Sequence, residues 1–295
     1  MTSLAAQKTH KEQTSNGLEI RRADFPNPSV TEVRNFSKPR PIRAGGLPQK
    51  AESEPTARNR SCAACAIFEL NLCAAASDKT DSKVSRRPGE APFVSSAHTI
   101  PARRMICHPK EWSEFVPIVC DGWAASSITL HDGRRQILSF LMSGEFASTA
   151  CLFEPMAGRS VESVTEVTYR KFKRSDFKAV VFGNPDLLEK LSKTWAQERA
   201  EADQLALDLG RRTADERIAR LILNLAERLG KRDAVRDQTM EFPLRQRHIA
   251  DATGLTPVHV SKVLGEFQRA GLVAINDRSL TIINETALRR VADWR

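Results

Sequence analysis

The sequence has no long apolar run, and no stretch approaches the roughly 20 residues that a membrane-spanning helix needs. Its first residues, MTSLAAQKTHKEQTSNG, also lack the apolar segment of a signal peptide, so we expect a protein of the cytosol. In that reducing compartment the six cysteines are expected to stay free, to bind metal or to do redox work.

The common catalytic patterns are missing as well. We find no Ser-His-Asp set, no Gly-rich phosphate loop and no paired-carboxylate motif, and the six histidines are scattered. We therefore expect that the protein is not an enzyme. The one catalytic alternative is a thiol redox enzyme that uses Cys62 and Cys65.

Charge is strongly unbalanced, with a net charge of +9 and a pI of about 9.5. An anionic partner is expected, with nucleic acid first and a membrane surface second. Because many basic proteins bind neither, the charge has to be located before it carries a function.

The first part of the chain divides into a polar tail and a cysteine-containing segment. Residues 1–60 are rich in Pro, Ser, Asn, Lys and Arg with few evenly spaced apolar positions, which predicts a disordered tail. Residues 61–98 contain SCAACAIFELNLC, in which Cys62, Cys65 and Cys73 follow a C-x2-C-x7-C spacing. A metal site, a redox pair and incidental thiols are all open at this point.

Residues 99–184 show short β-type runs broken by turns. Asp132-Gly133 between two such runs predicts a hairpin, because Gly accepts the positive φ that the turn needs. Several strands at this spacing predict a small β-barrel or roll, which we take as a sensor domain.

Residues 185–210 change to a helical pattern with apolar positions spaced alternately by three and four, typical of a dimerisation helix. If two copies pair in parallel, their Glu198 side chains face each other and repel, which would make dimerisation adjustable. The alternative is a register one residue off, with Glu198 solvated. The predicted seam consists of Leu188, Leu191, Trp195, Glu198, Ala202, Leu205 and Leu209.

Residues 211–295 carry the strongest pattern, a helix-turn-helix followed by a wing. Gly254 supplies a tight turn, Thr256 caps the second helix and Pro257 lies in its first turn, where it costs no hydrogen bond. A hairpin around residues 276–279 predicts the wing; the alternative is a plain helical bundle with a hairpin. The expected DNA contacts are Thr256, Pro257, Val258, His259, Ser261, Lys262, Arg269 and Arg278.

Three segments, HDGRRQILSFLMSGEF, TADERIARLILNLAERL and RQRHIADATGLTPVHVSKVLGEFQRAGLV, resemble the Crp/Fnr family of bacterial transcription regulators. The resemblance covers residue 100 to the end. It implies an α+β fold with a cyclic-nucleotide-binding-like β-roll, a long dimerisation helix and a C-terminal winged helix-turn-helix. It also implies a cytoplasmic homodimer that binds double-stranded promoter DNA, with RNA polymerase as a further partner.

The chain departs from the family pattern at two places. Ser261 and Lys262 match the family's recognition helix, but Val258 stands where a base-reading Glu is common, so the preferred DNA site should differ there. In the cyclic-nucleotide cassette, Arg159 and Ser160 match the phosphate positions, but Thr149 replaces the ribose-binding Glu.

The cysteine trio resembles that of Fnr-type oxygen sensors, closest in spacing to the rhizobial FnrN and FixK type. This implies a 4Fe-4S cluster held by Cys62, Cys65 and Cys73, since soft thiolates suit iron and sulfide. A structural zinc site would want a fourth compact Cys or His ligand, and no His lies beside the trio. A thioredoxin-like C-x-x-C needs a βαβ context, which is missing here.

The fourth cluster ligand is not where the resemblance puts it, because Tyr169 and Arg170 occupy that region. Cys107 and Cys120 lie in strand-like segments and are expected to be small buried hydrophobes. Cys151, in a loop, is our choice. We expect an oxygen- or redox-responsive regulator; the alternative effector is a small molecule bound in the roll by Thr149, Arg159 and Ser160.

Overall fold

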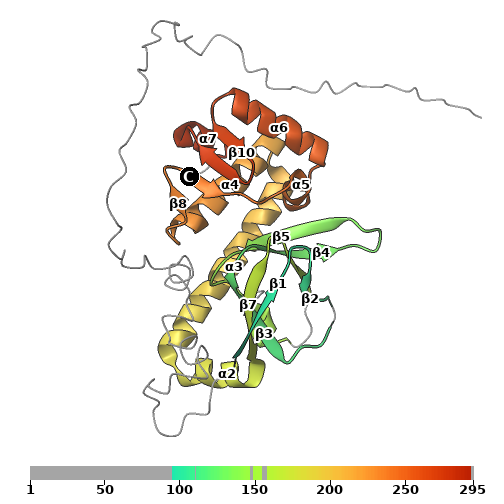
Figure 1. The fold of residues 1–295 in the computed structure, drawn as a ribbon, viewed down its shortest axis with the longest axis vertical. Helices are drawn as coiled ribbons and strands as arrows, with labels where there is room; N and C mark the ends of the chain where they lie inside the picture. The colour runs from blue at the N-terminus through green and yellow to red at the C-terminus, as the bar shows by residue number, and fades with distance from the viewer. Residues whose placement is uncertain (1–94, 110, 147–148, 155–157, 294–295) are drawn as a thin grey trace, which may run out of the picture. The chain divides into compact units, whose positions relative to one another are not determined.

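The computed structural model describes residues 95–109, 111–146, 149–154 and 158–293 (Figure 1). The predicted tail and nearly all of the predicted cysteine segment lie outside these residues. Three parts follow one another along the described chain: a β-roll, a long helix, and a second half that combines helices with a small sheet.

The roll consists of two antiparallel sheets, one with the order β1-β7-β3 and one with the order β2-β6-β4-β5. Val116, Ile118 and Phe172 are buried within the roll, whereas Ala125, Ile137 and Phe140 are buried in a cluster shared with the second half of the chain. The strands are β1 (Ser95–Ile100), β2 (Met105–Cys107), β3 (Phe115–Asp121), β4 (Ala124–Thr129), β5 (Arg135–Leu141), β6 (Ser160–Ser163) and β7 (Val167–Lys173).

The hairpin predicted at Asp132-Gly133 is confirmed. Strands β4 and β5 pair antiparallel up to Thr129 and Arg135, and the Leu130 N–H donates to the Arg134 carbonyl at 2.8 Å. Gly133 has a φ of +86°, a conformation that a residue with a side chain seldom adopts.

The roll core continues into the helices that follow it. Helix α2 (Arg174–Gly183) and the start of α3 (Pro185–Arg211) cover one end of the roll and contribute Phe177, Val181 and Leu191 to its apolar interior. Asn184 caps α3 by accepting from the Leu187 N–H at 3.1 Å, and Pro185 occupies the first turn.

Helix α3 is one residue longer than predicted, because Gly210 does not break it. The helix ends at Arg211, and Thr213 then opens α4 (Ala214–Gly230). Thr213 and Glu216 form a capping box: the Thr213 N–H donates to the Glu216 side chain at 2.9 Å, and the Glu216 N–H donates to the Thr213 hydroxyl at 3.4 Å.

The second half of the described chain packs α4 against three shorter helices and a four-stranded sheet with the order β10-β11-β9-β8. The apolar face of α4, centred on Ile218, Ile222 and Leu225, forms the middle of this core. The remaining elements are β8 (Val235–Arg236), β9 (Thr239–Glu241), α5 (Gln246–Thr253), α6 (Pro257–Arg269), β10 (Val273–Asn276), β11 (Ser279–Ile282) and α7 (Glu285–Val291).

The seam predicted along α3 is wrong at Leu191. That side chain is 7% exposed and packs into the roll of its own chain, while Leu188, Trp195 and Ala202 are exposed. The alternating spacing of three and four residues shows that one side of the helix is apolar. It does not show whether that side packs against a partner chain or against the helix's own domain. The predicted seam is therefore divided between two faces of α3.

Charged side chains join the roll to α4. The Glu145 carboxylate contacts Arg228 at 2.6 Å and Arg232 at 2.5 Å, and it also accepts from the Met142 N–H at 3.1 Å. A second junction lies at the start of β5, where Arg135 contacts both Glu162 of the roll and Asp251 of α5 at 2.8 Å. Within the described part of the chain, no helix is both long and apolar enough to span a membrane.

The Glu145 junction yields a stability prediction. Glu145→Ala leaves two largely buried guanidinium groups facing each other without their carboxylate, so we expect a loss of about 2–4 kcal/mol in the free energy of unfolding. Glu227→Ala is the matched control, because Glu227 pairs with Lys231 at the exposed surface and should lose less than about 0.5 kcal/mol. Urea unfolding followed by circular dichroism measures both, and equal losses would contradict the structural role of Glu145.

Candidate functional site

Helices α5 and α6 meet at a turn whose left-handed backbone conformation favours glycine. Gly254 has a φ of +67°, and a Cβ there would lie 2.9 Å from Cδ2 of Leu209 at the end of α3. Thr256 then caps α6 by accepting from the His259 N–H at 3.3 Å, with Pro257 next to it. The predicted helix-turn-helix is confirmed, and its turn packs against the long helix.

Helix α6 has one buried and one exposed face. The buried face consists of Val260, Val263, Leu264 and Phe267. Val258 is 80% exposed, which is unusual for an apolar side chain of this size and leaves it free to contact another molecule. The predicted DNA-contact residues are all exposed: Thr256, Pro257, Val258, His259, Ser261, Lys262, Arg269 and Arg278.

The beginning of α4 reaches the charged side of α6. Burial and the nearby Glu266 carboxylate raise the pKa of Asp215, while His259 and Lys262 act in the opposite direction. The Asp215 carboxyl group is thus within electrostatic range of Lys262.

The wing is the hairpin of β10 and β11. Asp277 adopts a φ of +51° in its turn, and the Ser279 hydroxyl donates to the Asn276 carbonyl at 2.8 Å. The Arg278 carbonyl accepts from the Phe242 N–H at 2.6 Å, which anchors the turn while its side chain stays exposed.

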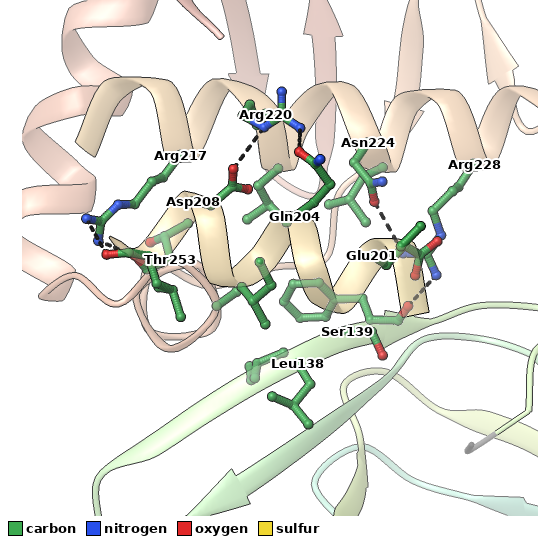
Figure 2. Close-up of a pocket in the computed structure, with 18 of the residues that line it drawn as sticks. Leu138, Ser139, Glu201, Gln204, Asp208, Arg217, Arg220, Asn224, Arg228 and Thr253 are labelled. Carbon is green, nitrogen blue, oxygen red and sulfur yellow. Dashed lines mark hydrogen bonds and ion pairs between the residues drawn. The ribbon is translucent and has the colours of Figure 1, made fainter. Parts of the chain in front are cut away.

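Arg217 fixes the helix-turn-helix to the long helix, a role that the sequence did not reveal. Its guanidinium donates to the carbonyls of Leu209 at 3.0 Å, Arg212 at 2.9 Å and Thr253 at 3.1 Å. Two of these carbonyls belong to the end of α3, where helical partners run out, and the third ends α5 (Figure 2). One side chain therefore sets the place of the α5–α6 turn.

A pocket of about 300 Å³ lies between α3, α4 and β5 (Figure 2). Asp208 contacts Arg220 at 3.0 Å, and the Gln204 side chain accepts from Arg220 at 2.8 Å. Leu138 forms part of the apolar floor on β5. The polar side chains of this pocket bind one another across the α3–α4 junction.

A larger groove of about 780 Å³ runs between α3 and the roll, and it contains two of the three predicted effector residues. Thr149 and Arg159 line it. Arg159 has no hydrogen-bond or ion-pair partner among the described residues. Ser160 is buried, and its hydroxyl donates to the Ser127 carbonyl at 3.1 Å.

Glu198 lies in this groove and binds Thr149. The main-chain N–H of Thr149 donates to Oε1 at 3.1 Å, and its hydroxyl donates to Oε2 at 2.7 Å. Within the described chain, Glu198 thus binds its own roll instead of pointing freely into solvent. A buried main-chain N–H needs an acceptor, and α3 supplies one from 49 residues further along the chain.

The predicted cluster ligands are only partly placed. Cys62, Cys65 and Cys73 lie outside the described residues. Cys151 is half-buried against the roll interior, its carbonyl accepts from Arg174 at 2.8 Å, and burial raises the pKa of its thiol. Among the described residues, no group of three or more His, Cys, Asp or Glu side chains could hold a metal ion.

The other two roll cysteines differ slightly from expectation, because both are half-buried. Burial and the neighbouring Cys151 raise the pKa of Cys107 to about 12, so the two thiols lie within reach of each other's charge. The position at which the resemblance expects a ligand is filled by the buried ring of Tyr169.

Comparison with known proteins agrees with this architecture. Residues 97–184 match the cyclic nucleotide-binding domain and residues 216–291 the Crp-like helix-turn-helix domain. The nitrogen fixation regulation protein FixK of Bradyrhizobium diazoefficiens is 27% identical over 78% of this chain and 93% of its own length. FixK of Rhizobium meliloti is 32% identical over 56% of this chain and 72% of its own length.

Among solved structures, FixK2 from Bradyrhizobium japonicum superposes with a TM-score of 0.61 and 27% identity. It covers 68% of this chain and 98% of its own length. Since the winged helix-turn-helix, the roll and the long helix are all present in the expected order, the chain belongs to the Crp/Fnr family of DNA-binding transcription regulators and is of the FixK type.

Proposed function

We propose that this regulator acts as a homodimer whose DNA binding responds to oxygen or redox state. The observation that carries the DNA-binding part is the exposed face of α6, which Arg217 and the Gly254 turn hold in a fixed place on α3 and α4. RNA polymerase is the further partner that we infer from the family.

The helix-turn-helix formed by α5 and α6, here called the reading head, has a geometry that supports placing α6 in the major groove of DNA. The first turns of α6 present Val258, Ser261 and Lys262 on one side, and α5 lies behind them. In this docking mode the wing residue Arg278 reaches a phosphate. Two copies would read half-sites about one helical turn of DNA apart, at a site with two-fold symmetry.

The exposed stripe of α3 supports the dimer. Leu188, Trp195 and Ala202 recur every seven residues, so they lie on the same side of the helix and are exposed together. A second copy of α3 is the partner we propose for this stripe.

We propose Cys62, Cys65, Cys73 and Cys151 as the ligands of a 4Fe-4S cluster. The spacing of the trio and the softness of thiolate ligands support this. Burial raises the pKa of the Cys151 thiol, so this ligand would have to lose its proton when the metal binds. When bound, the cluster would supply an oxygen-labile redox centre. Cys151 lies two residues after Thr149, so a change at its thiol is close to the contact with α3.

A small molecule in the groove between α3 and the roll is the second candidate signal. Arg159 favours it, because its guanidinium lines the groove without a partner among the described residues. Glu198 and Ser127 already engage Thr149 and Ser160, so such a ligand would meet only Arg159 of the three. Ligand-dependent protection of a variant with all cysteines replaced would favour this candidate.

Substitution of Lys262 tests whether α6 binds DNA. Lys262→Ala removes an exposed charge from α6, so we expect promoter binding to be lost while the melting temperature changes by less than about 2 °C. Lys231→Ala is the control, since Lys231 is an exposed lysine outside the helix-turn-helix and the wing, where it pairs with Glu227. Fluorescence anisotropy with duplex DNA measures both. Normal specific affinity in Lys262→Ala would contradict the assignment.

Substitution of Val258 tests whether this side chain contacts a base of the DNA. A valine can contact the methyl group of thymine but cannot accept a hydrogen bond from cytosine, whereas a glutamate can. We expect Val258→Glu to change the preferred base pair at one position of each half-site by about tenfold. Selection from a random duplex pool compares the two proteins, and identical preferences would show that Val258 does not face a base.

The cluster is tested by anaerobic purification with iron and sulfide analysis. We expect about four iron atoms per chain, with an absorbance band that bleaches in air. Cys62→Ser and Cys151→Ser should lose most of the iron, and Cys120→Ser is the control that keeps it. A colourless, iron-free protein that still binds DNA would contradict the cluster.

A further inference from the structure

The contact between Glu198 and Thr149 joins α3 to the roll. Both donors of Thr149 are used: its N–H lies 3.1 Å from Oε1 and 3.4 Å from Oε2, and its hydroxyl 2.7 Å from Oε2. Thr149 is 2% exposed, so water has little access to these donors. A single carboxylate from α3 therefore meets the hydrogen-bonding needs of a buried residue of the roll.

Two more contacts fix the same part of α3. Leu191 packs into the roll core seven residues before Glu198, which places both on one side of the helix about two turns apart. The Trp195 ring stacks on Phe153 with 6.0 Å between ring centroids. With an apolar contact below and a charged one above, α3 cannot rotate about its own axis unless one of them breaks.

The rotation of α3 decides which side chains a partner meets. In the observed rotation, Leu188, Trp195 and Ala202 are exposed, and Glu198 points into its own roll. If α3 turned so that Glu198 left Thr149, the stripe would turn away with it, and the carboxylate would take the place of apolar side chains in the dimer contact.

We propose that Glu198 is a positioning residue that sets the rotation of α3 through Thr149, and that dimerisation depends on this internal contact. The proposal rests on the proposed homodimeric function. In effect, α3 brings its own carboxylate to the groove, so that a diffusible ligand with an acidic group would have to displace Glu198 before it could bind Thr149.

The direction of one measurement separates this role from charge repulsion at a helix seam. A Glu198 that faces its copy weakens the dimer, so Glu198→Ala would make dimerisation tighter. A Glu198 that positions α3 supports the dimer, and the same change would make it weaker. We expect the dimer dissociation constant to rise by about tenfold or more, as for the loss of a charge-assisted hydrogen bond.

The experiment is sedimentation equilibrium of the full chain, with no DNA present. Glu189→Ala is the matched control, because Glu189 lies on the same helix and pairs with Lys193 at the exposed surface; we expect a change below about twofold. Glu198→Ala is then measured in sodium acetate or formate against sodium chloride at equal ionic strength. A small carboxylate should restore part of the dimer in Glu198→Ala and leave the wild type unchanged.

Thr149→Val provides the second arm, because it removes the hydroxyl and keeps the fold of the chain. It should weaken the dimer on its own, and the double variant should be no weaker than Glu198→Ala, since both changes break one contact. A dimer in Glu198→Ala as tight as in Glu189→Ala, or fully additive losses in the double variant, overturns the proposal. If Glu198→Ala does not fold, an unchanged dimer in Thr149→Val overturns it.

Different results would contradict the proposed function and the proposed role of Glu198. A wild-type dimer that does not bind duplex DNA counts against the proposed function and leaves the role of Glu198 standing. A wild-type protein that binds DNA while Glu198→Ala dimerises normally counts against Glu198 alone.

Discussion

The arrangement of the molecule depends on arginine side chains of α4 and of the turn that follows it, which donate to main-chain carbonyls of other elements. Arg217 binds carbonyls at the ends of α3 and α5, Arg228 binds that of Phe140 at 2.6 Å, and Arg232 binds that of Ser143 at 2.9 Å. Carbonyls at the ends of helices and strands lack regular partners, and leaving them buried and unpaired costs about 1–3 kcal/mol each. Helix α4 therefore holds the reading head to the roll and to α3 by satisfying groups that those elements leave open.

This anchoring makes α4 the element through which the roll can influence DNA binding. Glu145 receives both Arg228 and Arg232 just after β5, while Arg217 holds the α5–α6 turn near the other end of the same helix. A shift of β5 or of the turn after it would thus move α4 as one body, and the recognition face of α6 with it. The second junction, from Arg135 to Asp251, ties the same strand to α5.

How much the sequence could predict depended on whether the signal was local. The turn and the second-helix cap of the helix-turn-helix were predicted correctly because Gly254, Thr256 and Pro257 act on their own backbone or on neighbours within three residues. The α3 seam was predicted only in part, since periodicity shows that one side of a helix is apolar but not what covers that side. Leu191 is covered by the roll and Trp195 is 60% exposed, although both fitted the same pattern.

Contacts between residues far apart in the chain left no signal at all. Glu198 and Thr149 are separated by 49 residues and Arg217 and Thr253 by 36, and neither pair forms a motif. The family resemblance did not reveal the Glu198 contact either, because it showed only that Thr149 replaces the family's ribose-binding glutamate. The structure shows the same threonine in use, with a carboxylate from α3 as its acceptor.

The internal use of the groove bears on how a regulator of this fold could work. Of the three residues that the family pattern assigns to an effector, Thr149 binds Glu198 and Ser160 binds Ser127, which leaves Arg159. A groove whose polar groups are mostly satisfied from within gains little from a diffusible ligand, since each new hydrogen bond replaces an existing one. A signal that acts on the short segment around Thr149 and Cys151 meets no such competition, and it reaches α3 through a contact that is already formed.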